Sequence, residues 1–238
     1  MSEKKFKVVN GETYEYVLYK RVDPYSDILK QKLETFDFAN PPINPRELAL
    51  SLIETMVYYH GLGLSANQVG LPYRVFVMGA ESVGFACFNP EIISAEGEED
   101  YSEGCISYPG LFLKVKRAKS IKVRYTDMNG VQKEQQFDGL TARIFQHELD
   151  HLNGVDFTSK VNKTVLSRAK DKVKKNLKNI ERAQKEALIM QSLKNIQNKT
   201  QQIQEKTKNI SDLRQMIEVK DAAPVQRELP KTFDYTTP

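Results

Sequence analysis

The sequence predicts an α+β protein, because two amphipathic helices flank a series of short strand-like segments. The first helical pattern begins after Asn44, and the second begins after Asp138 and carries two histidines on its apolar side. Between them, apolar and polar residues alternate over segments that end at turn residues, which favours antiparallel strands. A long polar segment, poor in glycine and proline, predicts a further helix near the C-terminus.

Composition places the chain among ordinary globular proteins. Of the 238 residues, 40% are hydrophobic and 28% are charged. The sequence has no run of about 18 apolar residues, which excludes a membrane-spanning helix. It also has no signal-peptide core after Met1, so we expect a cytoplasmic protein. Two cysteines, Cys87 and Cys105, are too few for a disulfide framework, and a reactive or metal-bound thiol fits them better.

Charge divides the chain near residue 160. Residues 1–159 hold 17 Lys and Arg against 22 Asp and Glu, whereas residues 160–220 hold 16 against 6, a net charge of +10. Aromatic residues also become rare after this point. We therefore predict a compact catalytic domain at 1–160, a basic helical extension at 161–220 and a disordered tail at 221–238.

The two helices are marked at their ends. Asn44 stands at an N-cap position, Pro45 follows at the first helical position, and Gly61 is expected to end this helix. Gly154 is expected to end the second helix. The predicted strands run over residues 73–78, 85–88, 111–116, 121–126 and 131–137. Asn129-Gly130 turns the last two into a hairpin.

The strongest chemical signal is the segment 147–151, His-Glu-Leu-Asp-His. On a helix, two histidines four residues apart face the same side and can bind one divalent ion, and the glutamate between them reaches the water that the ion activates. The alternative is a pair of helical histidines that only pack or hydrogen-bond. The motif indicates a metal-dependent hydrolase without naming its substrate.

A catalytic metal site needs a third protein ligand, and Cys105 is the best candidate. It lies in the segment 103–107, Glu-Gly-Cys-Ile-Ser, where the glycine allows close approach and an ion would stabilise the thiolate. A buried structural cysteine is an equally open interpretation of Cys105 and the better one for Cys87. We expect His60, at the end of the first helix, to be a surface or capping residue.

A third segment, residues 61–68, reads Gly-Leu-Gly-Leu-Ser-Ala-Asn-Gln. Its small residues suggest a backbone that another backbone or a substrate approaches closely, although a plain glycine-rich loop is the default. Together the three segments resemble the motifs of the peptide deformylase family, Gly-x-Gly-x-Ala-Ala-x-Gln, Glu-Gly-Cys-x-Ser and His-Glu-x-x-His, in the same order. The resemblance covers about residues 6–160, and its one departure is Ser65 in place of alanine, from which we expect little effect.

The resemblance implies a fold with antiparallel strands around a central helix that carries the His-Glu-x-x-His motif. It also implies removal of the N-formyl group from the initiator formylmethionine of nascent polypeptides. The metal ligands would be Cys105, His147 and His151. Glu148 would be the general base and would pass its proton to the departing amine, while the metal, the Gln68 amide and the Ile106 N–H would stabilise the oxyanion.

The resemblance further implies an apolar pocket for the methionine side chain. Its lining would be Leu62, Glu103, Leu140, Arg143 and Ile144. The peptide backbone would pair like an added strand with Leu62-Gly63 and with Gly104. Arg143 is the least apolar of these residues, so we expect its stem to line the pocket and its head to reach solvent. The ligand set accepts zinc, iron(II), nickel or cobalt, and we expect Fe(II) by resemblance alone.

The basic segment 160–220 repeats apolar residues every seven positions. The repeats are Leu166, Val173, Ile180 and Ala187, then Ile189, Ile196, Ile203, Ile210 and Ile217. From Ile196 onward, polar residues such as Thr200 and Thr207 fill the second position that a coiled coil needs, so we predict a monomer. The isoleucine stripe could dock on the catalytic domain or on a partner instead.

Some family members bind the ribosome through a C-terminal helix, and the net positive charge of residues 160–220 suits RNA phosphates. We predict ribosome binding, with a solvated helix without a partner as the alternative.

Two other functions stay open at this point. A zinc protease would use the same His-Glu-x-x-His helix but would not need Cys105 or the segment 61–68. A protein that kept the fold only as a platform for an RNA- or protein-binding tail would bind metal without turning over formyl peptides.

Overall fold

The computed structural model describes residues 4–9, 11–80 and 83–221. Contacts divide the chain into two units, Met1–Lys175 and Asn176–Pro238. The strands are β1 (Lys4–Val9), β2 (Glu12–Val17), β3 (Gly63–Ser65), β4 (Val75–Ala80), β5 (Val83–Glu96), β6 (Glu99–Cys105), β7 (Tyr108–Arg117), β8 (Ser120–Thr126) and β9 (Gln132–Asp138). The α-helices are α1 (Pro45–Tyr58), α2 (Gly139–Leu152) and α3 (Lys163–Asp221).

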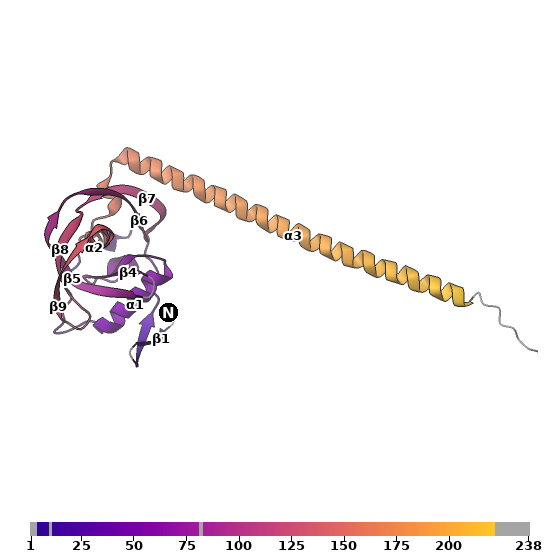
Figure 1. Cartoon of the computed structure of the whole chain (residues 1–238), viewed down its shortest axis with the longest axis horizontal. Coiled ribbons are helices and arrows are strands. Elements are labelled where there is room, and N and C mark those ends of the chain that lie inside the picture. The colour runs from indigo at the N-terminus through magenta and orange to yellow at the C-terminus, as the bar shows by residue number, and fades with distance from the viewer. Residues whose placement is uncertain (1–3, 10, 81–82, 222–238) are drawn as a thin grey trace, which may run out of the picture. The chain divides into compact units, whose positions relative to one another are not determined.

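Antiparallel pairing joins the strands of the first unit into three sheets. The largest has the order β3-β4-β5-β8-β9, and the pairs β1-β2 and β6-β7 form two smaller sheets. In Figure 1 helix α2 is viewed nearly end-on between β5 and β8 on one side and β6 and β7 on the other. The predicted α+β class, with antiparallel strands around a helix that carries both histidines, is confirmed.

Strand β4 explains how the core forms on both faces of the large sheet. Val75 and Val77 pack in a cluster with residues of α1, whereas Phe76 and Met78 pack in a second cluster with residues of α2. Successive strand residues point to opposite faces, so each helix covers one face of the sheet. This packing fixes α2 against the sheet and leaves its other side for the functional site.

Helices α1 and α2 adopt the same backbone arrangement at their C-terminal ends, and α1 is also capped at its N-terminus. Asn44 caps α1 as predicted, and its side chain accepts hydrogen bonds from Arg46 N and Glu47 N. At the C-terminal end, however, His60 and not Gly61 takes the left-handed conformation, with φ +54°. The N–H of His60 donates to Val57 O, and that of Gly61 donates to Met56 O, which completes a Schellman motif one residue earlier than predicted. His60 is exposed and caps the helix with its backbone.

Helix α2 ends as the sequence predicts. Gly154 has φ +71°, a conformation that a side chain would strain. Its N–H donates to His151 O, and the N–H of Val155 donates to Asp150 O. The predicted hairpin is also present, since β8 and β9 pair on either side of Gly130, which has φ +80°.

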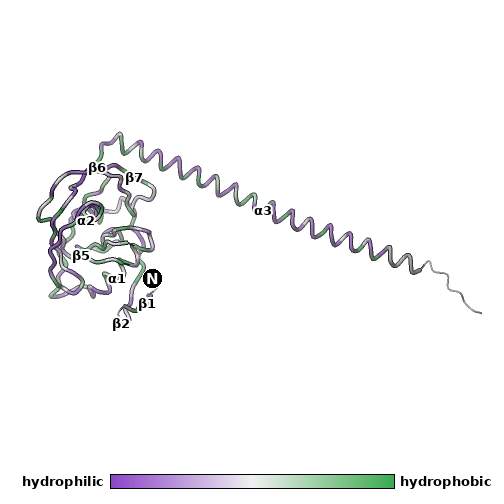
Figure 2. Tube along the Cα trace, in the orientation of Figure 1, coloured by the Kyte–Doolittle hydropathy of each residue, from purple (hydrophilic) through white to green (hydrophobic). Residues whose placement is uncertain are grey.

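Helix α3 belongs to both units. Its first turns pack against the small β6-β7 sheet, where Leu166, Ala169 and Val173 cover Phe157 and the inner side chains of β7. The described part of the second unit is the remainder of α3, in which all side chains described from Asn176 to Arg214 are exposed. Figure 2 shows α3 mostly in the hydrophilic colour. Among the described residues, no helix combines the length and the apolar character that crossing a membrane requires. The predicted domain limits at 160 and 220 stay predictions, and 222–238 lie outside the described residues.

Candidate metal centre and substrate pocket

Helix α2 and the end of strand β6 bring three metal-binding side chains together. The Cys105 sulfur and one ring nitrogen each of His147 and His151 all lie within 4.8 Å of one another. Both imidazoles are buried, and Cys105 is half-buried. The Cys105 Sγ lies 3.3 Å from His151 Nε2. The register of the β6-β7 pair shifts between Gly104 and Cys105, and such an irregularity re-aims a side chain.

This donor set fits a divalent transition-metal ion. One thiolate and two imidazoles are the ligands that such ions accept, and a site with three protein ligands leaves a position for a reactant. Burial lowers the pKa of His151 well below its usual range, so this imidazole stays neutral, as a ligand must. The predicted Cys105 is therefore part of a cluster, whereas Cys87 is fully buried in the core under α2.

A buried carboxylate orients the first histidine. Glu103 Oε2 lies 3.0 Å from His147 Nδ1, which leaves the Nε2 of this ring free to face an ion. Arg117 makes two further bonds to the same carboxylate, from Nε at 2.6 Å and from Nη2 at 3.0 Å. Burial opposes ionisation of Glu103, but its hydrogen bonds with His147 and Arg117 outweigh burial and lower its pKa to about 2.

The prediction that the Arg143 head reaches solvent is wrong. Its side chain is only 5% exposed, and Nη1 donates to Glu103 Oε1 at 2.6 Å and to Val115 O at 2.8 Å. Nη2 donates to Glu99 O at 2.6 Å. A guanidinium has five donors in a rigid fork, and here strands β6 and β7 accept several of them, which makes burial of the charge possible. Arg143 thus ties α2 to the β6-β7 sheet.

Glu148 lies deep in the site and keeps one oxygen without a partner. Its side chain is buried, and among the described residues Oε2 has no hydrogen bond. Burial raises the pKa of Glu148 to about 7. Gly63 of β3 faces this carboxylate so closely that a Cβ there would lie 2.8 Å from Glu148 Cδ. Only glycine lets the strand run past the glutamate at this distance.

Gln68 is held rigidly by the segment that precedes it. Its Oε1 accepts from Ser65 N at 2.9 Å and from Ser65 Oγ at 3.0 Å. Its Nε2 donates to Ser107 Oγ at 3.1 Å and to Cys105 Sγ at 3.4 Å. These contacts aim the amide nitrogen at the cysteine end of the cluster. Ser65, the one departure from the family motif, therefore supports Gln68, and its expected small effect on activity stays a prediction.

A hollow of about 590 Å³ opens onto this cluster. Its lining includes the predicted residues Leu62, Gly63, Glu103, Gly104, Cys105, Ile106, Leu140, Arg143, Ile144, His147 and Glu148. Gln68 and His151 do not line it, although both contact the Cys105 sulfur. Leu140 and Leu62 are exposed at 55% and 45%, so the hollow has an apolar rim that a ligand can reach.

Sequence reasoning missed several residues of the site. Arg117 orients Glu103 and also bonds Asp150 Oδ2 at 2.7 Å, and Ser107 supports Gln68. Tyr101 and Phe112 line the hollow from β6 and β7. A charged residue such as Arg117 at the end of a strand gives no local signal of its role. Its position became informative only when pairing of β6 with β7 brought it beside Glu103.

Comparisons with known proteins agree with this geometry. The family model described as polypeptide deformylase matches residues 19–166. A peptide deformylase of Thermotoga neapolitana is 48% identical over 105 residues, which cover 44% of this chain and 64% of that protein. A peptide deformylase of Thermotoga sp. strain RQ2 is 41% identical over 143 residues, covering 58% of this chain and 77% of that protein.

Solved structures show the same fold. A peptide deformylase of Synechococcus elongatus is similar with a TM-score of 0.61 and 35% identity, over 65% of this chain and 85% of that one. A peptide deformylase of Legionella pneumophila gives a TM-score of 0.60 and 30% identity, over 69% of this chain and 98% of that one. The matched family region, 19–166, contains all three motifs and excludes most of helix α3.

Proposed function

Because this chain belongs to the polypeptide deformylase family, we propose that it hydrolyses the N-formyl group of formylmethionyl peptides, with Glu148 as the general base. The observation that carries this proposal is the buried Glu148 carboxylate, with one unpartnered oxygen, beside the cluster of Cys105, His147 and His151. The products are formate and a peptide with a free amino group.

Three side chains would bind the metal. Cys105, His147 and His151 would hold one divalent ion, which when bound supplies Lewis acidity to the reacting centre. Fe(II) is the ion that we assign, although zinc, nickel and cobalt suit the same donors. Metal analysis of protein purified without oxygen tests this assignment, and iron at about one ion per chain is the expected result.

Glu148 would move the proton in both halves of the reaction. Its free oxygen accepts a proton from water as the water oxygen attacks the formyl carbon. When the carbon–nitrogen bond breaks, the same proton passes to the amine. A group with a pKa of about 7 both accepts and releases a proton readily near neutral pH. Burial, which sets this pKa, is thus part of the catalytic design.

Gln68 and Ile106 would stabilise the oxyanion. The Gln68 amide nitrogen already points toward Cys105 and is fixed by two donors on its oxygen. The Ile106 N–H follows the cysteine directly in the chain. Such preorganised donors lower the barrier because they need not reorient when charge develops.

The methionine side chain would enter the hollow between β3 and α2. Leu62, Leu140 and Ile144 give it apolar walls, and the peptide backbone would pair with Leu62-Gly63 and Gly104. The charged members, Glu103 and Arg143, neutralise each other through the Arg143 Nη1–Glu103 Oε1 contact. An apolar thioether therefore meets no unpaired charge from these two residues.

The test is deformylation of formyl-Met-Ala-Ser by metal-loaded protein purified without oxygen. We expect turnover that falls by about 100-fold to 10,000-fold in Glu148→Gln, with the metal still bound. Glu99→Gln is the matched control, since that side chain is exposed on β6. Full metal occupancy without turnover in the wild type would show that the site serves another purpose. Cleavage of internal peptide bonds would indicate a protease instead.

The basic helix suggests a location for this activity. Residues 160–220 carry a net charge of +10, which suits RNA phosphates, so we propose that this segment binds the ribosome and that the monomeric protein works in the cytoplasm. Sedimentation with ribosomes should be stronger for the full chain than for a chain ending at Lys175. Equal sedimentation of the two would refute ribosome binding by residues 176–220 without affecting the proposed hydrolysis.

A further inference from the structure

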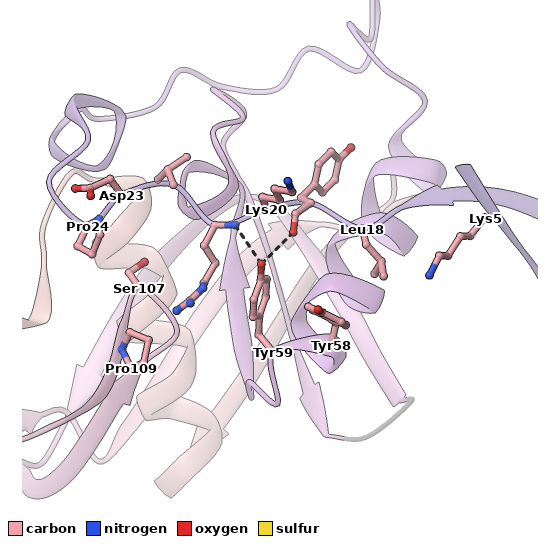
Figure 3. A pocket seen from close by; sticks show the side chains of 12 residues that line it. Lys5, Leu18, Lys20, Asp23, Pro24, Tyr58, Tyr59, Ser107 and Pro109 are labelled. Carbon is pink, nitrogen blue, oxygen red and sulfur yellow. Dashed lines mark hydrogen bonds between the residues drawn. The ribbon is translucent and has the colours of Figure 1, made fainter. Parts of the chain in front are cut away.

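A second hollow of about 810 Å³ lies beside the substrate pocket, and we call it the tyrosine groove. Residues 18–24, the C-terminal end of α1, and Ser107 and Pro109 at the start of β7 line it, as Figure 3 shows. Tyr59 stands in its middle, where its hydroxyl accepts from Arg21 N at 3.3 Å and donates to Tyr19 O at 3.5 Å. Nothing in the hydrolysis described above uses this groove.

The groove is continuous with the substrate pocket. Arg21, Tyr59 and Pro109 line both hollows. The Arg21 guanidinium lies over the Tyr59 ring, 4.9 Å from its centroid, and donates to the carbonyl of Ile106. The boundary between the two hollows is therefore made of side chains that a ligand can touch from either side.

The chain from Tyr59 to Gly63 gives the direction of a bound peptide. Gly63 faces the Glu148 carboxylate, whereas Tyr59 lies in the groove. The segment turns at His60, which has φ +54°, and becomes a strand only at Gly63, so it spans less than an extended chain of the same length. An extended peptide whose formyl end is at Glu148 advances about 3.3 Å per residue and would therefore reach the groove by about its fifth residue.

The groove has an excess of positive charge. Lys5, Lys20 and Arg21 line it, and Asp23 is its one acidic residue. Among the described residues, none of these three cations forms an ion pair. Tyr58 adds an aromatic surface and is 61% exposed. Cations without carboxylate partners next to exposed aromatic rings suit an anionic, partly apolar chain.

We propose that the tyrosine groove binds the downstream part of the substrate peptide, from about its fifth residue, and favours acidic side chains there. The inference rests on the proposed deformylation, because it takes the position of the formyl end from that reaction. Single-stranded RNA also suits basic and aromatic surfaces. Continuity with the substrate pocket favours the peptide.

The test measures peptide binding without turnover. Metal-loaded, full-length Glu148→Gln protein is titrated with two formylated octapeptides that carry a C-terminal fluorophore, and fluorescence anisotropy gives each Kd. Both begin Met-Ala-Ser-Ala and continue with either two glutamates or two lysines. At low ionic strength we expect the acidic peptide to bind about fivefold to tenfold more tightly.

Charge reversal in the groove sharpens this test. The substitutions Lys5→Glu and Lys20→Glu together should remove or reverse the preference, whereas Lys32→Glu, at an exposed lysine outside the groove, should retain it. Equal Kd values in the parent protein, or a preference that survives in the double variant, would overturn the proposal. So would oligouridine that binds at the two lysines while the peptides show no preference. Wild-type turnover of formyl-Met-Ala-Ser tests the hydrolysis separately.

Discussion

His147 Nδ1 lies 3.0 Å from Glu103 Oε2, and this contact links the metal cluster to a buried network of charges. Glu103 is fixed in turn by two arginines, one from β7 and one from α2. A carboxylate held from several sides cannot rotate, so the imidazole that it contacts keeps one orientation and presents Nε2 to the ion. The charged network therefore determines how precisely the His147 imidazole is oriented toward the ion.

Glu103→Gln should weaken metal binding by about 10-fold to 100-fold, because an amide cannot accept from both arginines and the histidine at once. Competition with a chelator at fixed pH measures this change. Glu99→Gln, in the same strand with an exposed side chain, is the control and should bind metal as the wild type does. Equal affinities of the two variants would mean that Glu103 does not orient His147.

Glu103 should also make the metal-free protein sensitive to acid. Its pKa is about 2 in the folded protein against an ordinary 4.5, so its stabilisation is fully present above about pH 4.5 and is lost as the pH falls toward 2. The shift corresponds to about 3 kcal/mol. Urea unfolding between pH 6 and pH 3 should show that the free energy of unfolding falls less steeply for Glu103→Gln than for the wild type. Parallel curves for the two proteins would contradict this prediction.

Gly63→Ala should lower kcat by about 100-fold, since the new methyl group would displace the Glu148 carboxylate. Gly84→Ala is a useful comparison, because a Cβ there meets two Ile53 side-chain atoms at 3.3 Å and, in ordinary van der Waals contact, Met78 O at 3.5 Å. We expect this variant to keep kcat within about twofold. Steady-state kinetics on formyl-Met-Ala-Ser would decide, and full activity of Gly63→Ala would show that Glu148 can work from another position.

The two cysteines should differ in reactivity. Iodoacetamide should modify half-buried Cys105 in the metal-free protein and leave fully buried Cys87 untouched, because burial raises the pKa of the Cys87 thiol and excludes the reagent. Bound metal should protect Cys105. Mass spectrometry of proteolytic peptides measures the extent to which each cysteine is modified. Modification of Cys105 at the same rate with and without metal would argue against its role as a ligand.

The sequence by itself determined the chemistry of the site, because that chemistry is encoded at short range. Helical geometry places His147 and His151 on one face whatever surrounds them, and α2 spans the predicted segment. Gly154 ends this helix because the left-handed conformation strains other residues. The β8-β9 hairpin formed at its Asn-Gly turn for the same reason.

Local sequence patterns did not predict the backbone conformation where it depends on residues distant in the sequence. Strand β6 reads Glu-Asp-Tyr-Ser-Glu-Gly-Cys, without alternation of apolar and polar residues, and it is a strand because β7 pairs with it. The left-handed residue after α1 is His60, whereas Gly61 lies against Ile106, where a Cβ would overlap Ile106 Cδ1.

Tertiary structure decided how the site is completed and where its charges lie. The shift between β6 and β7 turns Cys105 toward two histidines on a different element, which no spacing in the sequence encodes. Arg143 was expected to reach solvent, but strands β6 and β7 supply acceptors for its guanidinium and enclose it. A buried charge depends on partners that only the folded chain brings within reach, and the sequence alone does not contain that information.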